Sequence, residues 1–109
     1  MAGILLISMN IDEIRVKVKN SDYRFTVHAL ERSIERNISM KEIESAVLSG
    51  EIIEAYPEDK YGPSCLIHGK TESGRMFHVV CTLEPVWIIT AYDPALKPGK
   101  WNSDLRNRK

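Results

Sequence analysis

The stretch SCLIHGKTESGRMFHVVCT, residues 64–82, decides the fold of this 109-residue chain. Apolar and β-prone residues run on both sides of a Thr-Glu-Ser-Gly break at 71–74, a pattern typical of a β-hairpin. If residues 73–74 form a two-residue turn, His68 lies opposite Val79 in the hairpin. This register puts mainly apolar side chains on both faces of the two strands.

A sheet that is apolar on both faces needs cover on both. One layer of helices covers only one face, so we expect another segment or a partner on the second face. Trp101, in the C-terminal stretch, is the candidate from within the chain.

Two further strands are expected around the hairpin, which gives four in all: 52–56, 64–70, 75–82 and 86–92. The breaks between them contain Pro and Gly and are short enough for hairpins but too short for parallel crossovers. The sequence therefore predicts a four-stranded antiparallel β-meander.

Helical periodicity and capping signals come before the strands, and predict helices at 11–20, 27–36 and 39–50. The third is the clearest, because Ser39 and Glu42 form a capping-box pattern and Gly50 ends the apolar spacing. On the second helix we expect the core-facing side chains to be Val27, Leu30 and Ile34. Helices followed by strands predict an α+β fold.

The domain organisation is simple. Residues 9–109 are expected to form a single α+β domain with a basic C-terminal tail. Residues 1–8 are read as an extension, either disordered or upstream of the true start. This apolar tract lacks a charged leader region and is shorter than the roughly 20 residues that span a bilayer, so no membrane association is expected.

Charge is balanced in sum, with 15 basic and 15 acidic residues, but not along the chain. Residues 41–59 hold one lysine and six acids, and residues 95–109 hold five basic residues and one acid. One interpretation is that both segments are ordinary solvated surface. The other is that the basic residues form a rim that binds phosphate, while the acidic segment repels it elsewhere. Two cysteines are too few for a disulfide framework, which favours the cytoplasm.

Metal and cofactor chemistry is not expected. The spacings Cys65-x2-His68 and His78-x2-Cys81 resemble ligand pairs, but residues three apart on a strand point to opposite faces. The sequence has no phosphate-binding glycine loop and no dinucleotide fingerprint. Ser64 is better explained as a turn residue than as a nucleophile.

The remaining polar residues suit phosphodiester chemistry without a metal. His28 and His78 are candidates for acid and base. Arg32 and Arg36 would hold the phosphate and stabilise its developing charge. The residues that would orient the substrate or stack on a base are Tyr92, Tyr61 and Lys60. Each also has a structural interpretation, as a helix-end, sheet or strand-end residue.

Several blocks occur in an order that resembles a known family: YRFTVHALER at 23–32, GEIIEAYP at 50–57, PSCL at 63–66, GR at 74–75, HVV at 78–80 and IITAYDP at 88–94. They resemble the domain-of-unknown-function family 4258. That family is thought to be similar to the RelE/barnase/EndoU/colicin group of small ribonucleases, and its members often look like toxin partners of small antitoxins.

The resemblance implies a RelE/barnase-like fold, with RNA cleaved on the open face of the sheet and a small antitoxin-like protein as partner. Its polar positions fall on His28, Arg32, Tyr61, Ser64, His78, Thr90 and Tyr92. RelE-type toxins that act on the ribosome are strongly basic, whereas this chain is neutral, which favours either action on free RNA or a member that has lost activity.

Two functions therefore compete. The first is a metal-independent endoribonuclease of a toxin–antitoxin type, with His28, Arg32, His78 and Tyr92 in catalysis. Its substrate would be bound by Arg36, Lys60, Tyr61, Ser64 and Thr90. The alternative is a non-catalytic interaction module or dimerising domain, in which the apolar sheet face binds a partner or a second copy.

Overall fold

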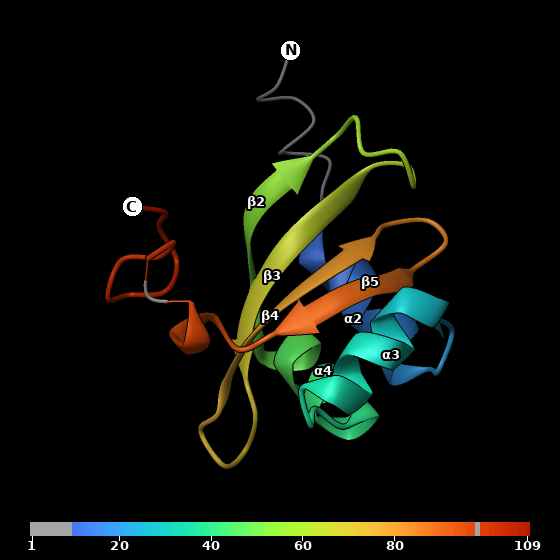
Figure 1. The fold of residues 1–109 in the computed structure, drawn as a ribbon. Helices are drawn as coiled ribbons and strands as arrows, with labels where there is room; N and C mark the ends of the chain where they lie inside the picture. Colours follow the sequence, from blue (N-terminus) through green and yellow to red (C-terminus); the bar gives the residue numbers. More distant parts are fainter. Residues whose placement is uncertain (1–9, 98) are drawn as a thin grey trace.

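In the part of the chain that the structure describes, three helices pack on one five-stranded sheet (Figure 1). The structure is a computed structural model that describes residues 10–97 and 99–109, so the extension expected at 1–8 lies outside the described residues. The elements are α2 Ile11–Lys19, β1 Arg24–Phe25, α3 Val27–Glu35, α4 Met40–Ser49, β2 Glu51–Tyr56, β3 Ser64–Lys70, β4 Met76–Thr82, β5 Trp87–Tyr92 and the 3₁₀ turn η1 Pro94–Leu96. Within the described ranges, no helix has the length and hydropathy to span a membrane.

The fold class is α+β as predicted, but the expected four-stranded antiparallel meander is wrong. The strand order is β1-β5-β4-β3-β2, and β1 pairs in parallel with β5. The Arg24 amide bonds the Val86 carbonyl at 3.1 Å and the Thr26 amide bonds the Ile88 carbonyl at 3.0 Å. A two-residue strand carries no periodicity of its own, so only tertiary pairing identifies it.

Local capping signals set the helix ends. The Ser39–Glu42 capping box is present in both directions, and α4 ends at Gly50. Asn10 caps α2 by accepting from the Asp12 amide. Side chains that satisfy the free amides at a helix start stabilise it locally, which explains why these boundaries are visible in the sequence.

The expected inner stripe of α3 is wrong. Ala29 and Ser33 face the sheet, whereas Val27 and Ile34 are 71% and 80% exposed and Leu30 lies beside them at the surface. Small side chains let the helix approach β5 closely, and the Ser33 hydroxyl is satisfied by donating to the Leu30 carbonyl. The apolar stripe of α3 therefore faces solvent.

The expected register of the β3–β4 hairpin is also wrong, by one residue. Thr71 and Arg75 close a three-residue loop, in which Gly74 adopts φ +88°. His68 therefore pairs with His78 rather than with Val79. An odd loop moves the side chains of one strand to the other face, so the two imidazoles share a face that the two-residue turn had kept apart.

The core lies between the helices and one face of the sheet. This face includes the free cysteines Cys65 and Cys81, which pair across β3 and β4. Gly69 lets α4 pack on β3, because a Cβ there would stand 1.8 Å from the Ala46 carbonyl oxygen. The opposite face carries His68 and His78.

Candidate functional site

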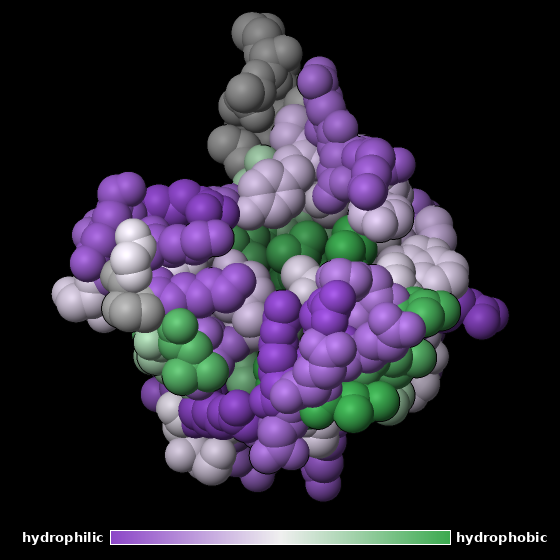
Figure 2. Space-filling model, viewed as in Figure 1, coloured by the Kyte–Doolittle hydropathy of each residue, from purple (hydrophilic) through white to green (hydrophobic). Residues whose placement is uncertain are grey.

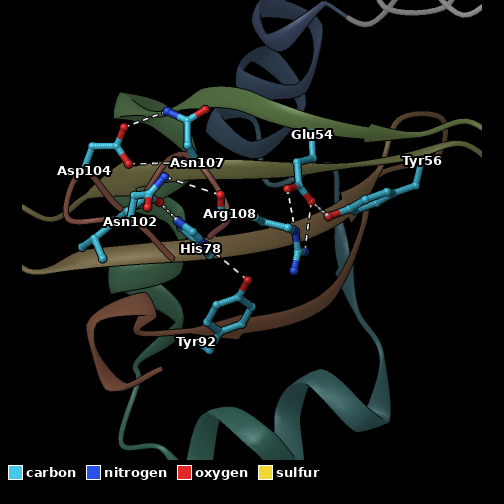
Figure 3. Close-up of polar contacts among 9 residues, drawn as sticks. Glu54, Tyr56, His78, Tyr92, Asn102, Asp104, Asn107 and Arg108 are labelled. Atoms are coloured by element: carbon cyan, nitrogen blue, oxygen red, sulfur yellow. Dashed lines mark hydrogen bonds and ion pairs between the residues drawn. The ribbon is translucent and has the colours of Figure 1, made fainter. Parts of the chain in front are cut away.

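The centre of the second sheet face is a buried imidazole pair. Nε2 of His78 lies 3.1 Å from Nδ1 of His68 and 2.6 Å from the Leu105 carbonyl oxygen. Nδ1 of His78 lies 3.2 Å from the Tyr92 hydroxyl (Figure 3). A carbonyl oxygen only accepts, so we assign the proton of His78 to Nε2. Nδ1 then accepts from the Tyr92 hydroxyl.

Burial keeps these groups uncharged. Burial lowers the pKa of His78 to about 4, although the bond to the Leu105 carbonyl acts in the opposite direction. It also lowers the pKa of His68, and Arg106 acts in the same direction. The pKa of Tyr92 is raised by burial. At pH 7 both imidazoles are therefore neutral and Tyr92 keeps its proton.

The C-terminal segment covers the imidazole pair. Trp101 is buried and meets the ring of His78 edge-on, with the ring centroids 4.5 Å apart. The expectation that Trp101 would close over this face is confirmed.

The basic tail is held by the acidic side of β2. Arg106 pairs with Glu51 at 2.5 Å. Arg108 pairs with Glu54 at 2.7 Å (Figure 3). The guanidinium of Arg108 also stacks on the Trp101 ring. The hydrogen bond from Arg108 lowers the pKa of Glu54. The basic C-terminal segment and the acidic β2 thus partly neutralise each other through ion pairs within the chain. Both of these arginines are engaged with carboxylates.

A cationic corner lies beside Tyr92. Nη1 of Arg36 donates to the Thr90 hydroxyl at 3.2 Å and to the Ala91 carbonyl at 2.8 Å. Nζ of Lys97 stands 4.7 Å from the centroid of the Tyr92 ring. We call Arg36, Thr90, Tyr92 and Lys97 the β5 corner. Because Arg36 uses only Nη1 in these bonds, its other nitrogens have donors for an anion.

The β5 corner forms because β1 is short. It pairs only with Trp87 and Ile88, so the rest of β5 has no strand on that side among the described residues. Arg36, at the C-cap of α3, passes this free edge and reaches the sheet face that bears Tyr92. Helix and strand together therefore position one guanidinium beside two hydroxyls.

Of the residues predicted for the site, the structure brings four together: Arg36, His78, Thr90 and Tyr92. Thr90 and Tyr92 lie on the same face because they are two residues apart on a regular part of β5, where they pair with Val80 and His78.

Other predicted residues lie apart from this group. His28 is exposed near the start of α3, and the described contacts of His78 come from Tyr92, His68 and the C-terminal segment instead. Arg32 pairs with Glu35 on the helix surface at 2.5 Å. Ser64 is buried and donates to Asp59 at 2.6 Å, which supports a structural role.

Lys60 and Tyr61 lie in the connection between β2 and β3, where Nζ of Lys60 stands 5.1 Å from the Tyr61 ring centroid. Tyr61 lines two surface cavities, described below.

Sequence reasoning missed His68 and Lys97. His68 was within reach, since Gly74 suits the positive φ of a three-residue loop, and that loop brings His68 opposite His78. The position of Lys97 depends on the turn after β5 and has no local sequence signal.

Within each of the spacings Cys65-x2-His68 and His78-x2-Cys81 the two side chains point to opposite faces as expected, although the predicted register had put Cys81 with His68 and Cys65 with His78. Cys65 and Cys81 point into the helix-covered core, whereas His68 and His78 point to the other face. Within residues 10–97 and 99–109, no group of three or more His, Cys, Asp or Glu side chains is arranged to hold a metal.

A model of the domain of unknown function DUF4258 matches residues 25–93. The chain belongs to the DUF4258 family. The match begins in β1 and ends after β5, so it includes Arg36, His78 and Tyr92 but not the C-terminal segment that covers His78. No curated protein and no solved structure matches this DUF4258 chain.

Proposed function

We propose that this DUF4258 protein is a metal-independent endoribonuclease whose phosphate-binding site is the β5 corner. The observation that carries the proposal is the Arg36 guanidinium, fixed against Thr90 beside the Tyr92–His78 hydrogen bond. A guanidinium with free donors binds phosphate in a defined geometry, and Lys97 adds a second positive charge.

The Tyr92–His78 pair suits proton transfer. His78 is oriented by the Leu105 carbonyl and accepts from the Tyr92 hydroxyl, so Tyr92 presents an oxygen backed by a buried base. Tyr92 is half-buried whereas His78 is fully buried, so the proposal gives the contact with RNA to Tyr92 and the place behind it to His78.

In the proposed reaction the ribose 2′-oxygen attacks the adjacent phosphorus and the P–O5′ bond breaks. The 2′-hydroxyl proton passes to the Tyr92 oxygen while the Tyr92 proton moves to Nδ1 of His78. The leaving 5′-oxygen takes a proton from water. The imidazolium then returns its proton through Tyr92 to the hydroxide. The products are a 2′,3′-cyclic phosphate and a 5′-hydroxyl end.

In this scheme the partner of His78 in proton transfer is Tyr92 instead of the expected His28. His28 and Arg32 were predicted as catalytic, but the proposal gives the proton transfer to Tyr92 and His78 and the phosphate to Arg36. A pKa of about 4 makes His78 a weak base, so we expect slow turnover at neutral pH.

The cellular role belongs to the same proposal. The resemblance to RelE/barnase-type ribonucleases supports a toxin role in the cytoplasm, with a small antitoxin-like protein as inhibitor. The zero net charge supports free RNA rather than ribosome-bound RNA as substrate.

The test is incubation of the purified chain with single-stranded RNA in the presence of a chelator. We expect cleavage with cyclic-phosphate ends, and a loss of about 100-fold or more in Tyr92→Phe and Arg36→Gln. Arg24→Gln, which removes an exposed arginine from β1, is the matched control and should retain activity. Activity lost in His28→Gln but retained in Tyr92→Phe would refute this assignment of roles.

A protein-interaction module is the second candidate, favoured by the solvent-exposed apolar stripe of α3. Val27 and Ile34 are the most exposed members of this stripe. A partner or second copy that buries it would explain a helix whose apolar face points outward. Ile34→Glu would then abolish the complex or dimer measured by light scattering, while leaving RNA cleavage unchanged.

A further inference from the structure

Two exposed aromatic rings frame a small cavity next to the β5 corner. The cavity has a volume of 260 Å³ and is lined by Thr26, Tyr61, Thr82, Trp87 and Ile89. Tyr61 and Trp87 also line a neighbouring cavity of 220 Å³. Tyr61 is 54% exposed and Trp87 is 37% exposed, whereas Thr82 and Ile89 are buried. The aromatic rings therefore contribute exposed walls above a buried floor.

Figure 2 shows a hydrophobic hollow over the strands, flanked by hydrophilic side chains of the C-terminal segment and of the helix side. An exposed apolar patch with a polar rim is typical of a binding site. The 260 Å³ cavity is smaller than pockets that hold drug-sized ligands, so it suits a single planar ring system.

The hydroxyls of the floor are already engaged. Thr82 donates to the Pro85 carbonyl at 2.6 Å and accepts from the Trp87 amide at 2.8 Å. Thr26 caps α3 and contacts the Ile89 carbonyl. These groups are not free to read the edge of a base, so the cavity offers shape and stacking rather than sequence-specific hydrogen bonds.

The cavity lies in register with the β5 corner. Trp87 and Thr90 are three residues apart on β5, at most about 10 Å along the strand. Residues three apart on a regular strand point to opposite faces, but β5 holds one extra residue between the pairs Val80–Thr90 and Cys81–Ile88. This irregularity returns Trp87 to the sheet face that carries Thr90. This separation lets one nucleotide place its base at the cavity and an adjacent phosphate at Arg36. Lys60, beside the Tyr61 ring, supplies positive charge at the other end of the path.

We propose that Tyr61 and Trp87 form a stacking subsite for one base of single-stranded RNA, next to a phosphate held by Arg36. This inference rests on the proposed function for the identity of the ligand. Aromatic stacking beside cations is the usual means by which proteins hold single strands with little sequence preference. The subsite therefore accepts any of the four bases.

The test measures binding separately from cleavage, with a fluorescent 2′-O-methyl hexauridylate that lacks the attacking hydroxyl. A strand of the same length without bases is the matched ligand, and fluorescence anisotropy gives both dissociation constants. We expect Tyr61→Ala and Trp87→Ala each to weaken binding of the base-bearing strand about five-fold or more. Binding of the abasic strand should not change.

Two variants control for structural effects. Trp87→Phe keeps an aromatic face and should retain most of the affinity. Val16→Ala removes an exposed apolar side chain from α2 and should bind as the wild type does. Circular dichroism checks that each variant is folded.

Equal affinity of the wild type for the two strands would overturn the subsite. So would competition by an aromatic peptide but not by a nucleoside monophosphate, which would assign the cavity to a protein partner. The two proposals can fail separately. Cleavage that depends on Arg36 but not on the aromatic pair would refute only the subsite, and base-dependent binding without cleavage would refute only the nuclease.

Discussion

Acidification from pH 7 to pH 5 should destabilise the fold through His78. Its pKa is about 4 in the folded chain and near 6.5 when the chain is unfolded. The unfolded chain therefore takes up the proton first, and stability falls as the pH falls from about 6.5 towards 4. These two pKa values give a loss of about 2 kcal/mol in the free energy of unfolding between pH 7 and pH 5.

Other titratable groups near His78 also contribute to the pH dependence of the free energy of unfolding. The lowered pKa of His68 acts in the same direction and adds to it. Glu54 and Arg108 also approach the ring, but the lowered pKa of Glu54 takes effect mainly below pH 5. Tyr92 keeps its proton throughout this range. The interval from pH 7 to pH 5 therefore isolates the histidines.

The assay is urea unfolding followed by far-ultraviolet circular dichroism at pH 7, 6 and 5. The variant His78→Gln should lose about 2 kcal/mol of the pH dependence, whatever its stability at pH 7. His28→Gln, which removes an exposed imidazole, should keep the wild-type dependence. A wild-type stability that changes by less than about 0.5 kcal/mol over this range would refute the reasoning.

Three further outcomes are expected. Gly69→Ala should destabilise the fold by about 3 kcal/mol or more in urea unfolding, because the new Cβ would overlap the Ala46 carbonyl. An unchanged unfolding midpoint would contradict the close packing of α4 on β3. Ser39→Ala should lower the free energy of unfolding by about 1 kcal/mol through loss of the helix cap. A urea unfolding curve in which only the baseline of the unfolded chain changes would argue against this. Arg108→Ala should free Glu54 and speed amide exchange in the C-terminal segment, with no effect expected in β3; uniform acceleration would instead indicate global destabilisation.

Element boundaries were the part of the fold most accessible from the sequence, because they depend on neighbouring residues. The capping box from Ser39 to Glu42 and the strand at 64–70 were both predicted correctly. The registers and faces were less accessible. One extra residue in the loop before Arg75 inverted the β4 face, and the rule that apolar residues point inward failed on α3, where Ala29 and Ser33 pack instead.

The candidate site shows the same division. Arg36 was predicted to hold phosphate, Thr90 to bind the substrate and Tyr92 to act in catalysis, but their convergence depends on the short β1 and the free edge of β5. The partner of His78 was misassigned because its identity follows from register and from a tail more than 20 residues further along the chain. Such long-range contacts leave no trace in local spacing.

The position of Arg36 also affects how the molecule behaves in concentrated solution. An unpaired strand edge offers carbonyl and amide groups to which another chain can add a strand. Nη1 of Arg36 occupies the Ala91 carbonyl on this edge and places a charge there. Replacing this arginine therefore leaves the edge of β5 free to pair with another chain. We expect Arg36→Gln to precipitate at protein concentrations at which the wild type stays in solution.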